Sequence, residues 1–405
     1  MRRSSAWMAI VSVGAAATAC SLPPDTGDEE TQAESQALSS RVCFVATGLG
    51  TLGGNSSSAT DINDRGHVVG GAQRLDGQSH AFLWRRGRMK DLGTLGGFSG
   101  ASDVNDRDQV VGQSETATGE LHAFFWDGGR MRDLGTLGGN FSGGARINDE
   151  GQVTGGSTTA NGESHAFLWE RGSRMKDLGT LGGERSLSSG INNRGQVVGF
   201  AQLASGSFRA FLWQRGRMKD LGTLGGDHSA AGGINERGQI VGSSTTKNGE
   251  EHAFLWEHGR MKDLGTFEGG TLSSASAINA RGQILGFART GTGEFRAVLW
   301  EKGGVKDLGG INTTAFALND RGQVTGISQP TVGGFLHAFF WQKGTMTDLG
   351  TLGDNFGSSG LAINNEGQVA GSSQGLVSQA VVWEQRRCGR KDRSRPDTPP
   401  DDGRD

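Results

Sequence analysis

His80-Ala81-Phe82-Leu83-Trp84, followed by Arg88-Met89-Lys90-Asp91-Leu92 and Gly93-Thr94-Leu95-Gly96-Gly97, is the stretch that decides the fold. The chain repeats this pattern with variations, so Trp recurs at a nearly constant interval. Apart from Trp7, tryptophan lies at positions 84, 126, 169, 213, 256, 300, 341 and 383, with gaps of 41 to 44 residues. A period in the low forties indicates an array of small units that bury their apolar faces against their neighbours.

Each of the eight units carries four strand signals. A strand of small residues ends at an Asn, as in Ser58–Asn63, and a second strand opens as Val68-Val69-Gly70. The Phe-Leu-Trp stretch is the third strand and Arg-Met-Lys-Asp-Leu is the fourth. Four antiparallel strands in 40 to 45 residues are the size of one propeller blade. The frequent glycines, 71 in all, exclude a helical repeat.

The turns between the strands have their own signatures. Asn63-Asp64-Arg65-Gly66 predicts a type I turn with a glycine bulge, because Gly supplies the positive φ. One copy has Asp108 in place of this Gly, and we expect only mild strain there. The tips Asp76-Gly77, Asn161-Gly162 and Asn248-Gly249 predict two-residue primed turns between the second and third strands.

The two ends of the array complement each other. Residues 41–48 occupy the place of a fourth strand, whereas Ala380-Val381-Val382-Trp383 is a third strand that no fourth strand follows. The N-terminal strand therefore completes the last blade, which removes two free sheet edges. The prediction is an all-β, eight-bladed propeller of four-stranded antiparallel blades closed in this way. A β-solenoid would have no use for the complementary strand.

Two cysteines fit the same closure. Cys43 and Cys388 both fall beside the tip of the last third-to-fourth hairpin. In an exported protein such a pair is most simply a disulfide, and the chain-entropy model gives it roughly 5 kcal/mol. The alternative is a pair of free thiols or metal ligands.

The chain ends differ in composition from the repeats. Residues 1–20 have an export signal's positive start, at Arg2 and Arg3, and a short apolar run. Ala17-Thr18-Ala19-Cys20 has the form of a lipoprotein box that would place lipid on Cys20. A plain secretory signal is the alternative. We expect residues 21–40 to be a flexible acidic tether, 41–389 the propeller and 390–405 a disordered tail.

The motifs resemble those of the HAF-repeat family, probable extracellular bacterial repeat proteins. The resemblance rests on His-Ala-Phe-Leu-Trp, Asp-Leu-Gly-Thr-Leu-Gly-Gly and Ile-Asn-x-x-Gly-Gln-Val and covers about residues 49–383. Arg209, Arg296 and Gln379 depart from it by replacing the His. The family implies export and a repeat β architecture, and no catalytic residues can be carried over from it.

No metal, cofactor or nucleic-acid site is expected. The recurring His, one per unit, would lie too far apart to share a metal ion, and Arg takes the same place in two units, so a structural hydrogen bond is the better interpretation. The formal net charge of −3 gives no reason to expect nucleic acid. Basic pairs in the fourth strand, such as Arg88 and Lys90, protect an outer edge or form a basic rim for acidic polysaccharide.

Specificity is expected where the copies differ inside a constant frame, just after the glycine corner. These positions should gather on one face of the disc and contact a carbohydrate or peptide. The alternative is that they are ordinary variable turns. The candidate ligand-binding residues are Asn55, Phe98, Phe141, Arg185, His228 and Phe356.

The resulting functional hypothesis is a lipid-anchored binding scaffold on the cell envelope that recognises a glycan or protein. We expect it to be monomeric, to contact the membrane only through its lipid and to have no catalytic activity. Uniform repeat lengths leave no insertion to carry a catalytic cluster. An enzyme acting on extracellular polysaccharide and a purely structural surface protein are the alternatives.

Overall fold

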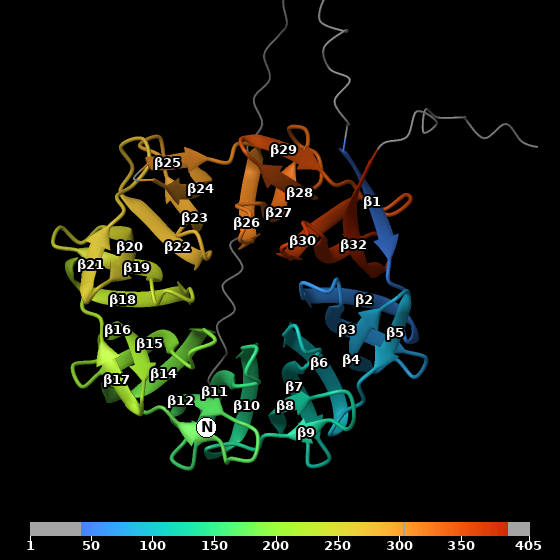
Figure 1. The fold of residues 1–405 in the computed structure, drawn as a ribbon, viewed down its shortest axis with the longest axis horizontal. Helices are drawn as coiled ribbons and strands as arrows, with labels where there is room; N and C mark the ends of the chain where they lie inside the picture. Colours follow the sequence, from blue (N-terminus) through green and yellow to red (C-terminus); the bar gives the residue numbers. More distant parts are fainter. Residues whose placement is uncertain (1–41, 303, 388–405) are drawn as a thin grey trace, which may run out of the picture. The chain divides into compact units, whose positions relative to one another are not determined.

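A computed structural model of the chain describes residues 42–302 and 304–387. The expected export signal, Cys20, tether, tail and Cys388 lie outside these residues, so the predictions made for them stay predictions. The described chain is all-β and splits into strands at every place where the repeat pattern has one. Figure 1 shows these strands in successive groups around a central space.

Each repeat begins with a strand that lies nearest the centre in Figure 1. These first strands are β2 (Gly53–Ile62), β6 (Gly96–Val104), β10 (Gly138–Ile147), β14 (Gly182–Ile191), β18 (Gly225–Ile234), β22 (Leu272–Ile278), β26 (Ile311–Leu318) and β30 (Gly357–Ile363). The second strands are β3 (Val68–Arg74), β7 (Val110–Thr116), β11 (Val153–Thr159), β15 (Val197–Leu203), β19 (Ile240–Thr246), β23 (Ile284–Arg289), β27 (Val324–Gln329) and β31 (Val369–Gln374).

The third strand of each repeat carries the Trp, and the fourth is short and basic. The third strands are β4 (Ser79–Arg85), β8 (Leu121–Trp126), β12 (Ser164–Trp169), β16 (Phe208–Gln214), β20 (Glu251–Glu257), β24 (Phe295–Glu301), β28 (His337–Gln342) and β32 (Ser378–Arg387). The fourth strands are β5 (Arg88–Asp91), β9 (Arg132–Asp133), β13 (Lys176–Asp177), β17 (Arg217–Asp220), β21 (Arg260–Asp263), β25 (Gly304–Asp307) and β29 (Thr345–Asp348).

Pairing within a repeat is antiparallel from first to fourth strand, as in the order β2-β3-β4-β5. Short parallel bridges, such as Phe141 of β10 with Leu121 of β8, join some neighbouring repeats into larger sheets of up to 12 strands. The last repeat has the order β1-β32-β31-β30, where β1 is Val42–Gly48. Residues 42–48 therefore occupy the fourth-strand position that the sequence predicts.

The apolar core lies between repeats rather than inside one. Val69 and Leu83 of the first repeat pack with Val110, Phe124 and Trp126 of the second. Similar clusters follow along the chain. One of them joins the last repeat to the first, because Ala370 and Val382 pack with Val68 and Phe82. Each repeat thus depends on both neighbours for its hydrophobic burial.

The two ends of each first strand give the molecule two faces. The turn face carries the Asn-x-x-Gly turns, such as residues 63–66, at the ends of the first strands. Trp84 pairs with both Val68 and Met89, so the third-to-fourth hairpin tips also belong to this face. The corner face carries the glycine corners, such as residues 93–97, and the second-to-third hairpin tips.

The turn predictions were partly wrong. The type I turn with a glycine bulge is confirmed, with Gly66 at φ 73° and Asp108 at φ 61°. The tip at Asp76-Gly77 is not a primed turn, because only its Gly has positive φ and Gly77 N–H bonds to Arg74 O. Asn161-Gly162 and Asn248-Gly249 follow the same three-residue pattern. The loop holds one more residue than a primed turn, so a type I turn and a left-handed Gly close it.

Candidate functional site

A cycle of asparagine hydrogen bonds joins the repeats on the turn face. In each repeat the Asn amide Nδ2 donates to the backbone carbonyl of the equivalent Asn in the next repeat. Asn63 bonds to Asn105 O, and Asn364 of the last repeat bonds to Asn63 O at 2.9 Å. The eight bonds measure 2.7–3.1 Å and form a closed cycle through Asn63, Asn105, Asn148, Asn192, Asn235, Asn279, Asn319 and Asn364.

Local geometry aims each of these side chains at its neighbour. Asn63 Oδ1 accepts from the backbone N–H groups of Arg65 and His67, which fixes the turn and leaves Nδ2 pointing outward from the repeat. All eight Asn are 3–5% exposed. A buried amide with these partners is costly to replace, because each lost bond leaves a buried polar group unpaired.

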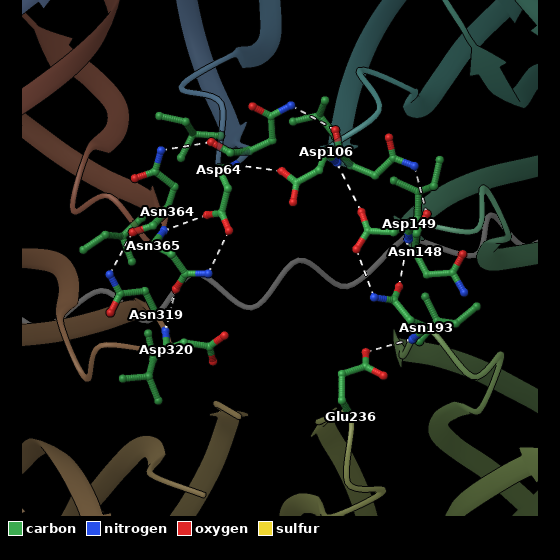
Figure 2. A pocket seen from close by; sticks show the side chains of 18 residues that line it. Asp64, Asp106, Asn148, Asp149, Asn193, Glu236, Asn319, Asp320, Asn364 and Asn365 are labelled. Atoms are coloured by element: carbon green, nitrogen blue, oxygen red, sulfur yellow. Dashed lines mark hydrogen bonds between the residues drawn. The ribbon is translucent and has the colours of Figure 1, made fainter. Parts of the chain in front are cut away.

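The next residue along each turn builds a second layer, shown in Figure 2. Its backbone N–H donates to the side chain at the same position in the next repeat, as from Asp64 to Asp106. Seven such bonds of 2.8–3.2 Å run around the centre, and Ala280, which has no acceptor, interrupts them. The side chains of this layer are Asp64, Asp106, Asp149, Asn193, Glu236, Asp320 and Asn365.

These polar side chains surround a pocket of about 360 Å³ at the centre of the turn face. Apolar side chains such as Ile62, Val104 and Ile147 lie at its base. Burial, with the charges of Asp64 and Asp149 added, raises the pKa of the Asp106 carboxyl above its ordinary value. The pocket therefore has an acidic rim and an apolar base. None of the six candidate ligand-binding residues lines it.

The residue two positions before the turn Asn in each first strand differs between the repeats. Asp61, Asp103 and Arg146 occupy this position in the first three repeats, whereas the other five have Gly or Ala. Asp61 Oδ2 accepts from Val104 N–H at 2.9 Å. Burial raises the pKa of Asp61 well above its ordinary value, and the adjacent Asp103 carboxyl raises it further. The sequence reasoning missed this pair, because it did not compare this position across repeats.

A second departure from the repeat pattern is a pair of contacting residues that are both replaced. His67 replaces the usual Gln, and Asp108 replaces the usual Gly at the position that this Gln faces in the next repeat. His67 Nδ1 lies 2.6 Å from Asp108 Oδ1, and Asn63 Nδ2 also donates to that oxygen. Burial alone would raise the pKa of Asp108, but the contacts with His67 and Asn63 outweigh it and the pKa is lowered.

The six residues predicted from the sequence all lie exposed at the corner-face ends of the first strands. Phe98, Phe141 and Phe356 are 39%, 38% and 47% exposed, although Phe is usually buried. Asn55, Arg185 and His228 hold corresponding places in their own repeats. Each comes from a different repeat, so the fold brings them to one face but not into one compact cluster.

A buried serine fixes each of these variable residues. Ser142 Oγ accepts from Ala123 N–H of the preceding repeat and donates to Gly135 O of the corner. Seven repeats have such a Ser, one or two positions after the variable residue, with bonds of 2.8–2.9 Å to the Ala N–H. The constant frame expected from the sequence therefore includes these serines, which the sequence reasoning overlooked: Ser57, Ser99, Ser142, Ser186, Ser229, Ser273 and Ser358.

The recurring His makes a structural contact, as expected. His80 Nδ1 bonds to Asp91 at 2.9 Å, and Asp91 Oδ1 also accepts from Gly93 N–H of the corner. The same arrangement recurs at His122, His165, His252 and His337. Where Gln379 replaces the His, Gly48 stands at the position of the Asp. The two residues thus change together, a signal that the sequence contains.

Exposed apolar residues concentrate on the corner face of the last two repeats. The rings of Phe335 and Phe356 lie 4.9 Å apart, and Leu336 O accepts from Ser358 N–H beside them. Val332 and Leu376, on the neighbouring tips, are 86% and fully exposed. Single exposed apolar residues are ordinary, but a contiguous group is typical of a contact surface.

The described residues contain neither a metal-binding cluster nor a membrane-spanning helix. Within residues 42–302 and 304–387, no three His, Cys, Asp or Glu side chains are arranged to hold a metal ion. The same residues contain no helix with the length and hydrophobicity needed to cross a bilayer.

No protein-family model matches the chain, and no curated protein matches it. Among solved structures it is similar to a structure of prolyl endopeptidases, with 12% identity and a TM-score of 0.52, over 73% of this chain and 49% of that one. It is also similar to the β-propeller domain of a protease from Pyrococcus furiosus, at 11% identity and a TM-score of 0.46 over 82% and 97% of the two chains. A lectin from Burkholderia pseudomallei matches at 11% identity and 0.41, over 76% and 99%. Identities this low bear on the fold alone: the chain has an all-β fold with β-propellers among its structural neighbours.

Proposed function

We propose that the chain is an eight-bladed propeller, closed by β1, that serves as a non-catalytic binding scaffold on the cell envelope. Three observations support the architecture. β1 pairs with β32 in the last repeat. An apolar cluster joins the last and first repeats. The Asn cycle returns from Asn364 to Asn63. Membership of the HAF-repeat family, export and a lipid on Cys20 belong to the same proposal, as does a disulfide between Cys43 and Cys388.

One observation carries the binding proposal: a constant frame holds different exposed side chains at one position of successive repeats. The serine bonds fix the backbone at Phe98 and Phe141 in the same way as at Arg185 and His228. A fixed backbone at these positions lowers the conformational entropy that would be lost when the exposed side chains bind a ligand. Exposed aromatic rings beside amide and charged groups suit a glycan or a protein surface.

The chain ends favour the corner face as the free face. Trp383 pairs with Val369 beside the last Asn turn, so β32 continues toward the turn face. β1 reaches the corner face only at Leu49, whose N–H bonds to Ala380 O. Val42 and Arg386 therefore both lie toward the turn face. A lipid on Cys20 would attach the domain through the end of β1 that lies on the turn face, so we propose the corner face as the ligand-binding face.

Binding of the full chain to separated envelope polysaccharide and envelope protein tests the proposal. We expect saturable binding to one fraction and at least a tenfold loss in the variant Phe98→Ala, Phe141→Ala, Phe356→Ala. The control variant Val45→Ala, Phe287→Ala, Phe316→Ala removes three apolar side chains of similar exposure and should bind normally. Equal losses in both variants, or no binding to either fraction, would contradict the proposal.

The enzymatic alternative needs its own measurement, because structural neighbours include peptidases as well as a lectin. Asp61 and Asp103 are neighbouring carboxyls, which is an arrangement that general acid–base hydrolysis uses. We expect no new reducing ends when the polysaccharide fraction is incubated with the protein. Release of products, abolished by Asp103→Asn, would replace the binding proposal with a hydrolase.

A further inference from the structure

The third-to-fourth hairpin tips on the turn face hold basic residues in an unfavourable backbone conformation. Arg86, Arg215, Lys302 and Lys343 have φ of 47° to 51°, and His258 has the same conformation at the equivalent tip. At four of these five tips the next residue is a Gly that also has positive φ. This is the geometry of a type I′ turn, whose first central position favours Asn, Asp or Gly. We call Arg86, Arg215, His258, Lys302 and Lys343 the tip residues.

Backbone preference does not explain these side chains. A long side chain in the left-handed region is disfavoured relative to Asn or Gly, yet five repeats carry Arg, Lys or His there. All five tip residues are exposed, so packing does not explain them either. Because such outliers persist where the side chain itself has a use, the charge is the feature to account for.

Charge is also polarised along each fourth strand. Arg88 begins β5 beside its tip on the turn face, whereas Asp91 ends the strand at the corner face and bonds to His80. Arg217 and Arg260 repeat this arrangement, with Asp220 and Asp263 at the other end. The turn-face hairpin tips therefore carry more basic than acidic side chains, although Glu257 and Glu301 adjoin two of the tip residues, whereas these fourth strands end in Asp at the corner face. The centre of the turn face is acidic, because it holds the rim of the pocket, so only the periphery is basic.

We infer that the tip residues dock the folded domain, turn face first, on an anionic phospholipid surface. Exposed cations at the tips of several repeats suit a flat surface, because several tips can contact it at once. Chain geometry agrees with this orientation, since Val42 and Arg386 lie toward the same face. Cys20 precedes Val42 by 22 positions, so an extended chain could span at most about 75 Å between them. The inference does not depend on the ligand proposed for the corner face.

Vesicle binding tests the inference. The full chain with Cys20→Ser, which cannot carry the lipid, is sedimented with vesicles of 30% phosphatidylglycerol in phosphatidylcholine and with pure phosphatidylcholine. We expect binding only to the anionic vesicles, weakening as salt rises from 50 to 300 mM. The variant Arg215→Asn, Lys302→Asn, Lys343→Asn should bind about a hundredfold more weakly, since each cation near an anionic surface contributes about fivefold.

A control variant shows whether the position of the cations or only the net charge of the protein determines vesicle binding. Arg74→Asn, Lys247→Asn, Arg289→Asn removes three cations at the corner-face tips and should retain vesicle binding. Asn favours the left-handed turn, so the turn-face variant should melt no lower than the parent. Equal losses in both variants, a lower melting temperature of the turn-face variant, or no binding of the parent would overturn the inference. Binding to soluble polygalacturonate without binding to vesicles would overturn it too, in favour of an acidic polysaccharide.

Discussion

At the scale of single residues, the repeat tolerates a substitution only when its contact partner changes as well. Elsewhere a Gln faces a Gly of the next repeat, as Gln109 faces Gly151. Only His67 and Asp108 replace both members, and a short hydrogen bond then joins them. In most repeats the Gln packs closely against the Gly of the next repeat, whereas His67 and Asp108 form a charge-assisted hydrogen bond instead. This bond offsets the energetic cost of the positive φ at Asp108.

A double-mutant cycle should measure this compensation. His67→Gln alone leaves the half-buried Asp108 carboxylate without its main partner, and Asp108→Gly alone leaves His67 without one. We expect each single variant to lose about 1 kcal/mol and the double variant, which restores the usual pair, to lose less than their sum. Urea unfolding at pH 7 gives the four free energies. Strict additivity would show that the two residues are not coupled.

Two of the carboxyls with shifted pKa values, Asp108 and Asp61, should respond to pH in opposite directions. The folded-state pKa of Asp108 is lowered, so its stabilisation is present at neutral pH and is lost as pH falls through that pKa. The pKa of Asp61 is raised, so the folded state loses stability as pH rises above the ordinary Asp value. Asp61→Asn should therefore stabilise the protein more at pH 7 than at pH 4. An equal effect at both values, measured by urea unfolding, would contradict the raised pKa.

Sequence reasoning reached these residues only in part. It identified Asp108 as a break in the pattern, and its left-handed conformation is confirmed. It did not pair Asp108 with His67, because the two lie 41 positions apart and meet only through the stacking of repeats. The six candidate residues lie exposed on one face, as expected, and their role in ligand binding stays a prediction.

At the scale of strands, the serine at the start of the first strand is the device that spaces neighbouring repeats. Ser142→Ala would leave Ala123 N–H and Gly135 O without their partner at a site that is fully buried. We expect a loss of about 1–3 kcal/mol in the free energy of unfolding. Ser205→Ala, at an exposed tip, should change it by less than about 0.5 kcal/mol. Similar losses in urea titrations would rule out the spacing role.

The fourth strand shows why element boundaries were predictable and their contacts were not. Alternation places Arg88 and Lys90 on one strand face, and both are exposed as expected. Lys90 Nζ also lies 4.6 Å from the ring of Trp126 in the next repeat, and Lys176 and Lys219 lie over Trp213 and Trp256. These cation–π contacts add to the edge protection expected from the sequence. Alternation along a strand predicts which face of the sheet a side chain lies on, but not which residue of the next repeat it contacts.

At the scale of the whole molecule, the Asn cycle predicts that the junction between the chain's ends resembles every other junction. Asn364→Ala removes the bond to Asn63 O, and Asn192→Ala removes the one to Asn235 O. Both should lower the free energy of unfolding by a similar amount, about 3 kcal/mol, because each leaves several buried backbone groups unpaired. A much smaller effect of Asn364→Ala in chemical unfolding would indicate that the ends are not held together.

More of the architecture than of the function could be predicted, because the same strand pattern recurs in eight repeats of the sequence. The Trp period and the complementary chain ends led to the strand order, and the fourth-strand place of residues 42–48 is observed. The central pocket was missed, since its lining comes from single residues of many repeats that were each interpreted as turn formers. A comparison of repeats that looks for their shared residues overlooks residues that occur in only one or two of them, such as Asp61 and Arg146.

The Asn cycle has a consequence for the way such a chain can be encoded. A cycle of equivalent contacts has no first member, so the position at which translation begins is not fixed by the contacts themselves. A circular permutant that joins Arg387 to Val42 through a short linker and opens at the exposed tip Lys247-Asn248 would keep all eight Asn bonds. Gene rearrangements that move the start from one repeat to another are therefore open to this fold, and each would move the two chain ends to a different junction between repeats.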